Sequence, residues 1–141
     1  MGYVEENQET LTRLRQVLAR ASDDDLRREL PNGWTIVDTL GHLAFYDRRA
    51  EVLLRRYASE GVFASPYDYD TINDALLNLT RRIPPRAMAE EALAAADAAD
   101  RAAAETSPDL LPEIERLNQV RLDRAHHRRN HLAEIEAQLG S

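Results

Sequence analysis

The chain has 141 residues, a net charge of −7, and 43% hydrophobic against 30% charged side chains. This length and balance are typical of one globular domain, expected over residues 1–141, and exclude a disordered chain. No apolar run approaches the roughly 20 residues that a membrane span needs, and the acidic charge argues against nucleic acid as the main partner. The N-terminus lacks the pattern of a signal peptide, so we expect a cytoplasmic protein.

Two residue types are missing, and each absence limits the chemistry of the chain. Cysteine does not occur, which excludes disulfide bonds, thiolate-bound zinc and a cysteine nucleophile. All basic residues other than histidine are arginine, so Schiff-base catalysis by a lysine is excluded as well. Any thiol chemistry would need a thiol from outside the protein.

The hydrophobic pattern is helical along almost the whole chain, with no sustained two-residue alternation. The first helix is expected from about Val4 to Ala21, followed by a short helical piece at "SDDDL" that ends at "LPNGW". The second helix is expected from near Thr35 to about Ser59, and Thr35 with Asp38 forms a pair typical of a capping box. A looser connection, "EGVFASPYDYD", follows it.

The second half of the chain continues the helical pattern. Helical spacing resumes in "TINDALLNLTRRI" and stops at the prolines 84–85, after which a third long helix is expected from Arg86 to about Glu105. "TSPDLLP" ends that helix, and the last one is predicted from about Glu113 to Leu139. Four long helices in this length predict an all-α fold, a four-helix bundle.

Three of the four histidines fall within "AHHRRNHLAEI" in the last predicted helix. His127 and His131 are four residues apart and lie one turn above each other, the spacing at which two imidazoles can reach one metal ion. His126 points about 100° away from His127 and is expected to face solvent. The fourth, His42, lies at the border of the apolar stripe of the second helix. Because such pairs are also common on helix surfaces without a metal, the spacing alone leaves both interpretations open.

Charged residues flank the histidine pair. Glu134 lies on the same face of the last helix as the two histidines. It could orient an imidazole, act as a base or join the metal ligands. It could equally be a solvated surface residue. Arg124 and Arg128 lie nearer the apolar stripe than arginine usually does. They could bind the carboxylates of an anionic thiol cofactor, or form an ion pair with Asp47, which falls within the apolar stripe of the second helix.

Aromatic and acidic residues near the histidines have open roles as well. Asp38 and Tyr46 each lie one helical turn from the fourth histidine and could hydrogen-bond to it, although a helix start and a core edge explain them equally. Trp34 is expected to pack and not to bind substrate. Tyr67 and Tyr69 could cover the mouth of a cleft or anchor the connection that contains them.

These residues resemble the DinB/YfiT-like superfamily, bacterial metalloproteins built as four-helix bundles. The resemblance rests on "GW" followed by seven residues and "HL", and on "H-x-x-x-H-L" in the last helix, and it extends over the chain in length and helix order. It implies that His42, His127 and His131 hold a divalent metal ion and that Trp34 packs at the bundle end. It also implies an up-down-down-up helix order, for which residues 60–71 are long enough to cross over, and a homodimer.

Three imidazole ligands leave a coordination position open for water or a substrate, as in catalytic metal sites. Imidazole suits several divalent metals, of which we expect zinc first and nickel next. Characterised branches of the superfamily use low-molecular-weight thiols such as bacillithiol or mycothiol. The resemblance therefore implies a metal-dependent transferase that moves such a thiol onto an electrophilic small molecule. A metal-dependent hydrolase using metal-bound hydroxide, and a non-catalytic bundle that binds a small molecule or mediates interactions, stay open as alternatives.

Overall fold

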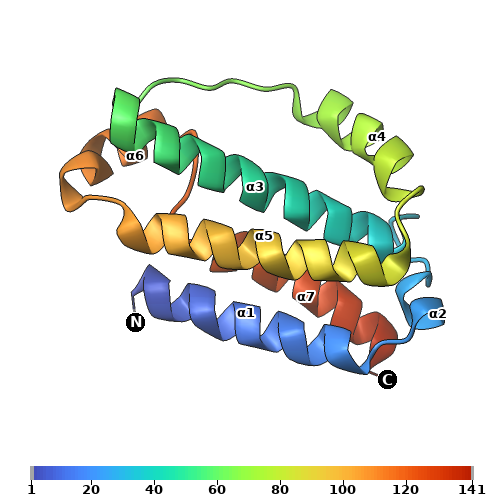
Figure 1. The fold of residues 1–141 in the computed structure, drawn as a ribbon. Coiled ribbons are helices and arrows are strands. Elements are labelled where there is room, and N and C mark those ends of the chain that lie inside the picture. Colours follow the sequence, from blue (N-terminus) through green and yellow to red (C-terminus); the bar gives the residue numbers. More distant parts are fainter. Residues whose placement is uncertain (1, 141) are drawn as a thin grey trace.

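A computed structural model describes residues 2–140 of the protein, most of which are helical (Figure 1). The four long helices are α1 (Tyr3–Arg20), α3 (Ile36–Glu60), α5 (Pro85–Glu105) and α7 (Ala125–Leu139). The shorter ones are α2 (Asp23–Leu26), α4 (Tyr69–Thr80) and α6 (Leu111–Leu117), with a 3₁₀ turn at Pro108–Leu110. Residues 2–140 contain no strand, only an isolated bridge between Glu29 and Thr35. The all-α prediction is confirmed.

The four long helices lie side by side, with α1 and α7 running in one direction and α3 and α5 in the other (Figure 1). Arg128 of α7 contacts Asn7 of α1, Asp47 of α3 and Asp100 of α5, so all four helices meet at one level. Because α3 and α5 are parallel neighbours, the chain between them must return along the bundle. Residues 61–84, which include α4, make this crossover.

Local hydrogen bonds explain where the helices begin. The side chains of Thr35 and Asp38 each accept from the other's backbone N–H, a capping box that fixes the start of α3, as the sequence predicted. Ser22 and Asp25 form the same motif at α2. Pro85 is the first residue of α5, where its missing N–H costs no helical hydrogen bond.

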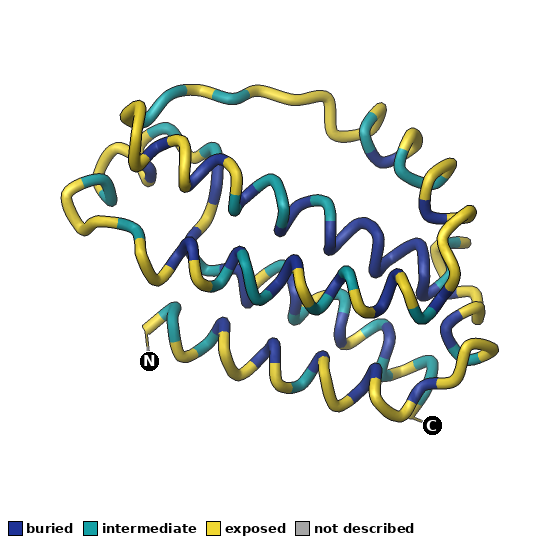
Figure 2. The backbone as a smooth tube through the Cα atoms, in the orientation of Figure 1, coloured by how far each residue is buried: buried dark blue, intermediate teal, exposed yellow. Residues whose placement is uncertain are grey.

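Buried residues recur along each of the long helices (Figure 2). Two hydrophobic clusters form the core. The first contains Leu14 of α1, Leu40 of α3 and Leu132 of α7, and the second contains Leu54 of α3 and Ile114 of α6. On α3, Asp47 falls between the residues of the first cluster, which end at Ala44, and those of the second, which begin at Ala50. A buried carboxylate thus separates the two apolar clusters along this helix.

The predicted last helix, from about Glu113 to Leu139, is wrong, because residues 118–124 are not helical. Asn118 takes a left-handed conformation, with φ 50° and ψ 45°, and its N–H donates to the carbonyl of Ile114, which ends α6. Asparagine tolerates this conformation better than most residues. Val120, which falls within the range of the predicted helix, enters the second cluster from the non-helical segment.

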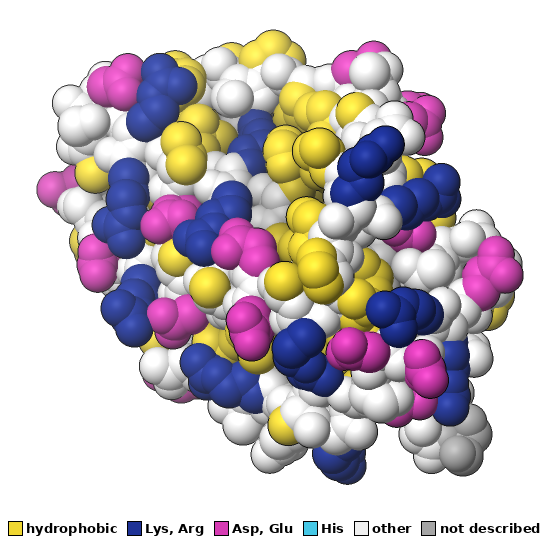
Figure 3. Space-filling view, turned by 45° about the vertical axis from the view of Figure 1, so that its right-hand side comes forward, with side chains coloured by type: hydrophobic (Ala, Val, Ile, Leu, Met, Phe, Trp, Pro, Cys, Tyr) yellow, Lys and Arg dark blue, Asp and Glu magenta, His cyan; other side chains and the backbone are white. Residues whose placement is uncertain are grey.

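One face of the molecule carries a band of hydrophobic side chains between charged ones (Figure 3). Exposed large hydrophobic residues include Leu79 and Ile83, and a depression between α3, α4 and α5 is lined by Phe45, Leu76 and Leu79. Within the described part of the chain, every helix is too short or too polar to cross a bilayer.

Candidate metal centre

Three histidines from two helices meet in space. His42 comes from α3, and His127 and His131 come from successive turns of α7. The ring centroids are 4.9 Å apart in all three pairs, and the ring planes are inclined to one another by 69° to 81°. One nitrogen atom of each ring lies within 4.8 Å of the other two. The structure thus brings together the three histidines selected from the sequence, and we call them the histidine cluster.

The donor set of the histidine cluster fits a divalent metal ion. Imidazole nitrogens bind zinc at about 2.0–2.1 Å, so ligand nitrogens around one tetrahedral ion lie roughly 3.4 Å apart. The Nε2 atoms of His42 and His127 are 2.9 Å apart and share a hydrogen bond. Small rotations of the rings would therefore be enough to admit an ion, and imidazole is a preferred ligand of zinc, nickel, copper and iron.

The histidine cluster is electrically neutral at physiological pH. Burial, together with the neighbouring His131, lowers the pKa of His42 to about 4. Burial and the other two histidines lower the pKa of His127 to about 3. Burial also lowers the pKa of His131, against the opposing effect of Glu134. Because a neutral imidazole keeps a lone pair, each ring can bind a metal without first losing a proton to solvent.

Asn73 of α4 supports the cluster from outside. Its Oδ1 atom lies 3.1 Å from Nδ1 of His42 and also accepts from the hydroxyl of Tyr46, at 3.3 Å. The sequence analysis missed this residue. One feature of the sequence could have indicated it. Asn73 is a polar residue next to Ile72 and one turn before Leu76, on the more apolar side of α4.

Glu134 and Trp34 contact the cluster in different ways. Oε1 of Glu134 lies 3.0 Å from Nδ1 of His131, but the two atoms are not aligned as in a hydrogen bond. A carboxylate at this place can still orient the ring electrostatically. The Trp34 ring lies 5.4 Å from that of His42 in an edge-on arrangement, which is consistent with packing at the start of α3.

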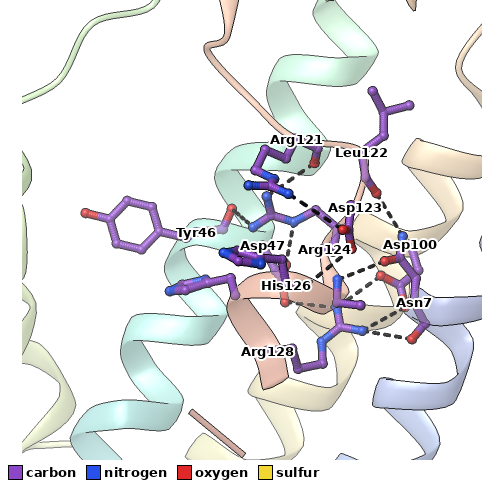
Figure 4. A network of polar contacts seen from close by, with 12 residues as sticks. Asn7, Tyr46, Asp47, Asp100, Arg121, Leu122, Asp123, Arg124, His126 and Arg128 are labelled. Carbon is purple, nitrogen blue, oxygen red and sulfur yellow. Dashed lines mark hydrogen bonds and ion pairs between the residues drawn. The ribbon is translucent and has the colours of Figure 1, made fainter. Parts of the chain in front are cut away.

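The two arginines that flank His127 are bound by carboxylates inside the bundle (Figure 4). Nε of Arg124 donates to Asp47 at 3.0 Å, and Arg128 donates to Asp47 at 3.4 Å and to Asp100 at 3.0 Å. The predicted ion pair between Asp47 and the arginines is confirmed. Arg128 is only 1% exposed, so this network, and not a cofactor, surrounds its guanidinium.

A cavity of about 380 Å³ lies beside the histidine cluster and reaches it at His127. Among residues 2–140, no Asp or Glu side chain lines it, although the protein as a whole is acidic. His126 is exposed, as expected, but it also lines this cavity. The lining includes three arginines. Arg49 donates to backbone carbonyls, whereas Arg121 and Arg124 are each paired with an aspartate outside the lining. A small anionic molecule is therefore the ligand class that this lining favours.

Tyrosines form the aromatic part of the cavity lining. Tyr69 stacks on Tyr46 with 5.7 Å between ring centroids, and the guanidinium of Arg49 lies 4.4 Å from the ring centre of Tyr67. Arg49 also donates to the carbonyl of Ser65, which fixes the connection after α3. The structure is thus compatible with both roles expected for these two tyrosines. They lie next to the cavity, and they anchor the connection that contains them.

The helical fold and the histidine cluster are those of a DinB/YfiT-like protein. The sequence model of the mycothiol maleylpyruvate isomerase N-terminal domain matches residues 8–137, a range that contains the whole cluster, and the chain belongs to this family. No curated protein and no solved structure is significantly similar to the chain.

Proposed function

We propose that the protein is a divalent-metal-dependent transferase that moves a low-molecular-weight thiol onto an electrophilic small molecule. The observation that carries the proposal is the convergence of His42, His127 and His131 beside a cavity with a basic lining. The family takes its name from a mycothiol maleylpyruvate isomerase, which supports a thiol of the mycothiol class. A chain without cysteine needs an external sulfur nucleophile for this chemistry.

The three histidines would hold the ion, with zinc expected first and nickel next. When bound, such an ion supplies Lewis acidity that favours thiolate over thiol at neutral pH. In the transfer, the thiol proton passes to solvent or a base, a carbon–sulfur bond forms, and a leaving group departs from the attacked carbon. If the electrophile is a conjugated double bond, a proton is added at the neighbouring carbon instead.

The surrounding residues would orient the reactants. We assign Arg124, at the cavity wall, to the attraction of the anionic thiol, and Arg128 to holding Asp47 and Arg124 in place. Glu134 would orient the ring of His131 and thus act through a ligand. We also propose an up-down-down-up bundle, supported by the helix directions in Figure 1, and a homodimer, which light scattering in solution would test.

Metal content and thiol dependence test the proposal. Protein purified without a histidine tag should contain about one equivalent of metal, which His131→Ala should lose, because one of three ligands is gone. His126→Ala is the matched control and should keep the metal, since that residue lies on the same helix but outside the cluster.

Turnover is then measured with mycothiol or bacillithiol and a panel of electrophiles that includes maleylpyruvate. Metal-dependent turnover that requires the thiol supports the transferase. Turnover without a thiol would replace it by the hydrolase, which would use metal-activated water. A wild-type protein that binds neither zinc nor nickel after reconstitution would leave only a non-catalytic bundle.

A further inference from the structure

The two buried residues of α4 are both polar. Asn73 is 8% exposed and Thr80 is 3% exposed, whereas Leu79 of the same helix is 62% exposed. A surface helix that docks for stability alone buries its apolar stripe against the core. The way in which α4 packs therefore calls for another explanation.

Both buried side chains make hydrogen bonds to α3. Oγ1 of Thr80 donates to Asp38 at 2.8 Å, and Oδ1 of Asn73 accepts from His42 at 3.1 Å. Asn73 and Thr80 are seven residues apart and so lie on one face of α4. Since the earlier residue of α4 meets the later residue of α3, α4 lies antiparallel along the part of α3 that carries the metal-binding histidine.

Contacts at both ends of α4 fix its distance from α3. A Cβ atom at Gly41 would overlap Cγ2 of Thr80, so glycine at this position permits the close approach. At the other end of α4, the ring of Tyr69 stacks on that of Tyr46. Asn73 lies between these two contacts, which leaves its amide little freedom to move away from α3.

The amide oxygen of Asn73 selects one tautomer of His42. An amide oxygen can only accept a hydrogen bond, so Nδ1 of His42 must carry the proton. Nε2, which lies against His127, is then the unprotonated nitrogen with a lone pair for a metal. The opposite tautomer would place a proton where the metal has to bind.

We propose that α4 serves to position the metal ligand, with Asn73 as the positioning residue that fixes the tautomer and the ring orientation of His42. The inference rests on the proposed metal centre. It gives the crossover a role beyond connecting two parallel helices, because the crossover brings a hydrogen-bond acceptor to Nδ1 of His42.

The test compares three variants of the full-length protein. Asn73→Leu removes the acceptor at similar volume, Asn73→Asp keeps an acceptor, and Asn78→Leu makes the same change at an exposed position of the same helix. Zinc affinity is measured by competition with a chromophoric chelator, and the tautomer of His42 by ¹⁵N NMR of the metal-free protein. Circular dichroism establishes that each variant is folded.

We expect Asn73→Leu to lower zinc affinity by about 10- to 100-fold, as is usual when the hydrogen-bond partner of a ligand is removed. It should also reduce the Nδ1-protonated form of His42, whereas Asn73→Asp and Asn78→Leu should keep both properties. A folded Asn73→Leu protein with unchanged affinity and tautomer would overturn the proposal. Equal losses of affinity in Asn73→Leu and Asn73→Asp would overturn it too, because the acceptor would then be irrelevant. If the wild type binds no zinc, the proposed function fails, and the NMR result alone decides whether Asn73 sets the tautomer.

Discussion

The bundle contains two groups of buried and half-buried polar side chains, and the groups differ in how they are stabilised. In the arginine–aspartate network, Asp47 and Asp100 each face a guanidinium, and the charges of two carboxylates and two arginines cancel. In the histidine cluster, three neutral imidazole rings converge, and two of them share a hydrogen bond. The first group holds helices together, whereas the second, in the function that we propose, would be completed by a metal ion.

The largest effect should come from breaking the network. Asp47→Ala leaves Arg124 and Arg128 with an incomplete set of counter-charges inside the bundle, and removing one partner of a buried ion pair typically costs about 3–5 kcal/mol. Urea unfolding of the metal-free protein measures the loss. The matched control is Glu105→Ala, which removes an exposed ion pair with Arg55 and should leave the midpoint unchanged. A similar loss in both variants would contradict the structural role of the network.

The next largest effect on stability should come from adding zinc to the histidine cluster. Zinc at 100 times its dissociation constant should raise the free energy of unfolding by about 2.7 kcal/mol, because it binds only the folded chain. His127→Ala should abolish this gain, and His126→Ala should retain it. Thermal unfolding with and without zinc measures both. A full gain in His127→Ala would place the zinc outside the cluster.

A smaller effect concerns pH in the metal-free protein. The pKa of His127 is about 3 in the native state and near 6.5 in an unfolded chain, so on acidification below pH 6.5 only the unfolded chain takes up the proton. The contribution of the neutral ring to stability is thus fully present above pH 6.5 and is lost as the pH falls. At pH 5.5, the loss for this residue should be about 1 kcal/mol.

The measurement for this pH effect is urea unfolding of wild type and His127→Gln at pH 7.5 and 5.5. Because the carboxylates titrate in both proteins, the difference between the two isolates the histidine. The variant should lose less stability on acidification than the wild type. A greater loss in the variant would mean that His127 is protonated in the native state.

The smallest effect should come from Glu134→Gln. The carboxylate is 38% exposed and not aligned with Nδ1 of His131, so its loss should lower zinc affinity by less than about tenfold. Chelator competition measures the change, with Glu136→Gln as the control on the same helix. A complete loss of metal in Glu134→Gln would instead make this carboxylate a ligand.

Local patterns were sufficient to predict much of the fold and of the cluster. Periodicity and caps predict the ends of α1, α3 and α5 within about two residues. Four-residue spacing puts His127 and His131 on one face, and the cost of an unpaired carboxylate in an apolar stripe predicts the arginine partners of Asp47.

Non-local features could not be predicted from such patterns. No glycine or proline marks the break after α6, because Asn118 adopts the left-handed conformation without a distinctive sequence signal. Asn73 meets His42 across two helices, and the position of His126 beside the cavity depends on where α7 begins after the break. These contacts depend on how the helices are placed relative to one another. The periodicity of a single helix carries no information about that placement.

His42 and His127 are 85 residues apart in the sequence, and this separation determines when the cluster can form during synthesis. A nascent chain that has emerged as far as α5 holds one of the three imidazoles, and the other two leave the ribosome only with α7. A metal ion therefore cannot act as a nucleus for the early helices, as it does in small zinc domains that are unfolded without it. For the metal centre that we propose, loading would be a late step that follows the synthesis of α7.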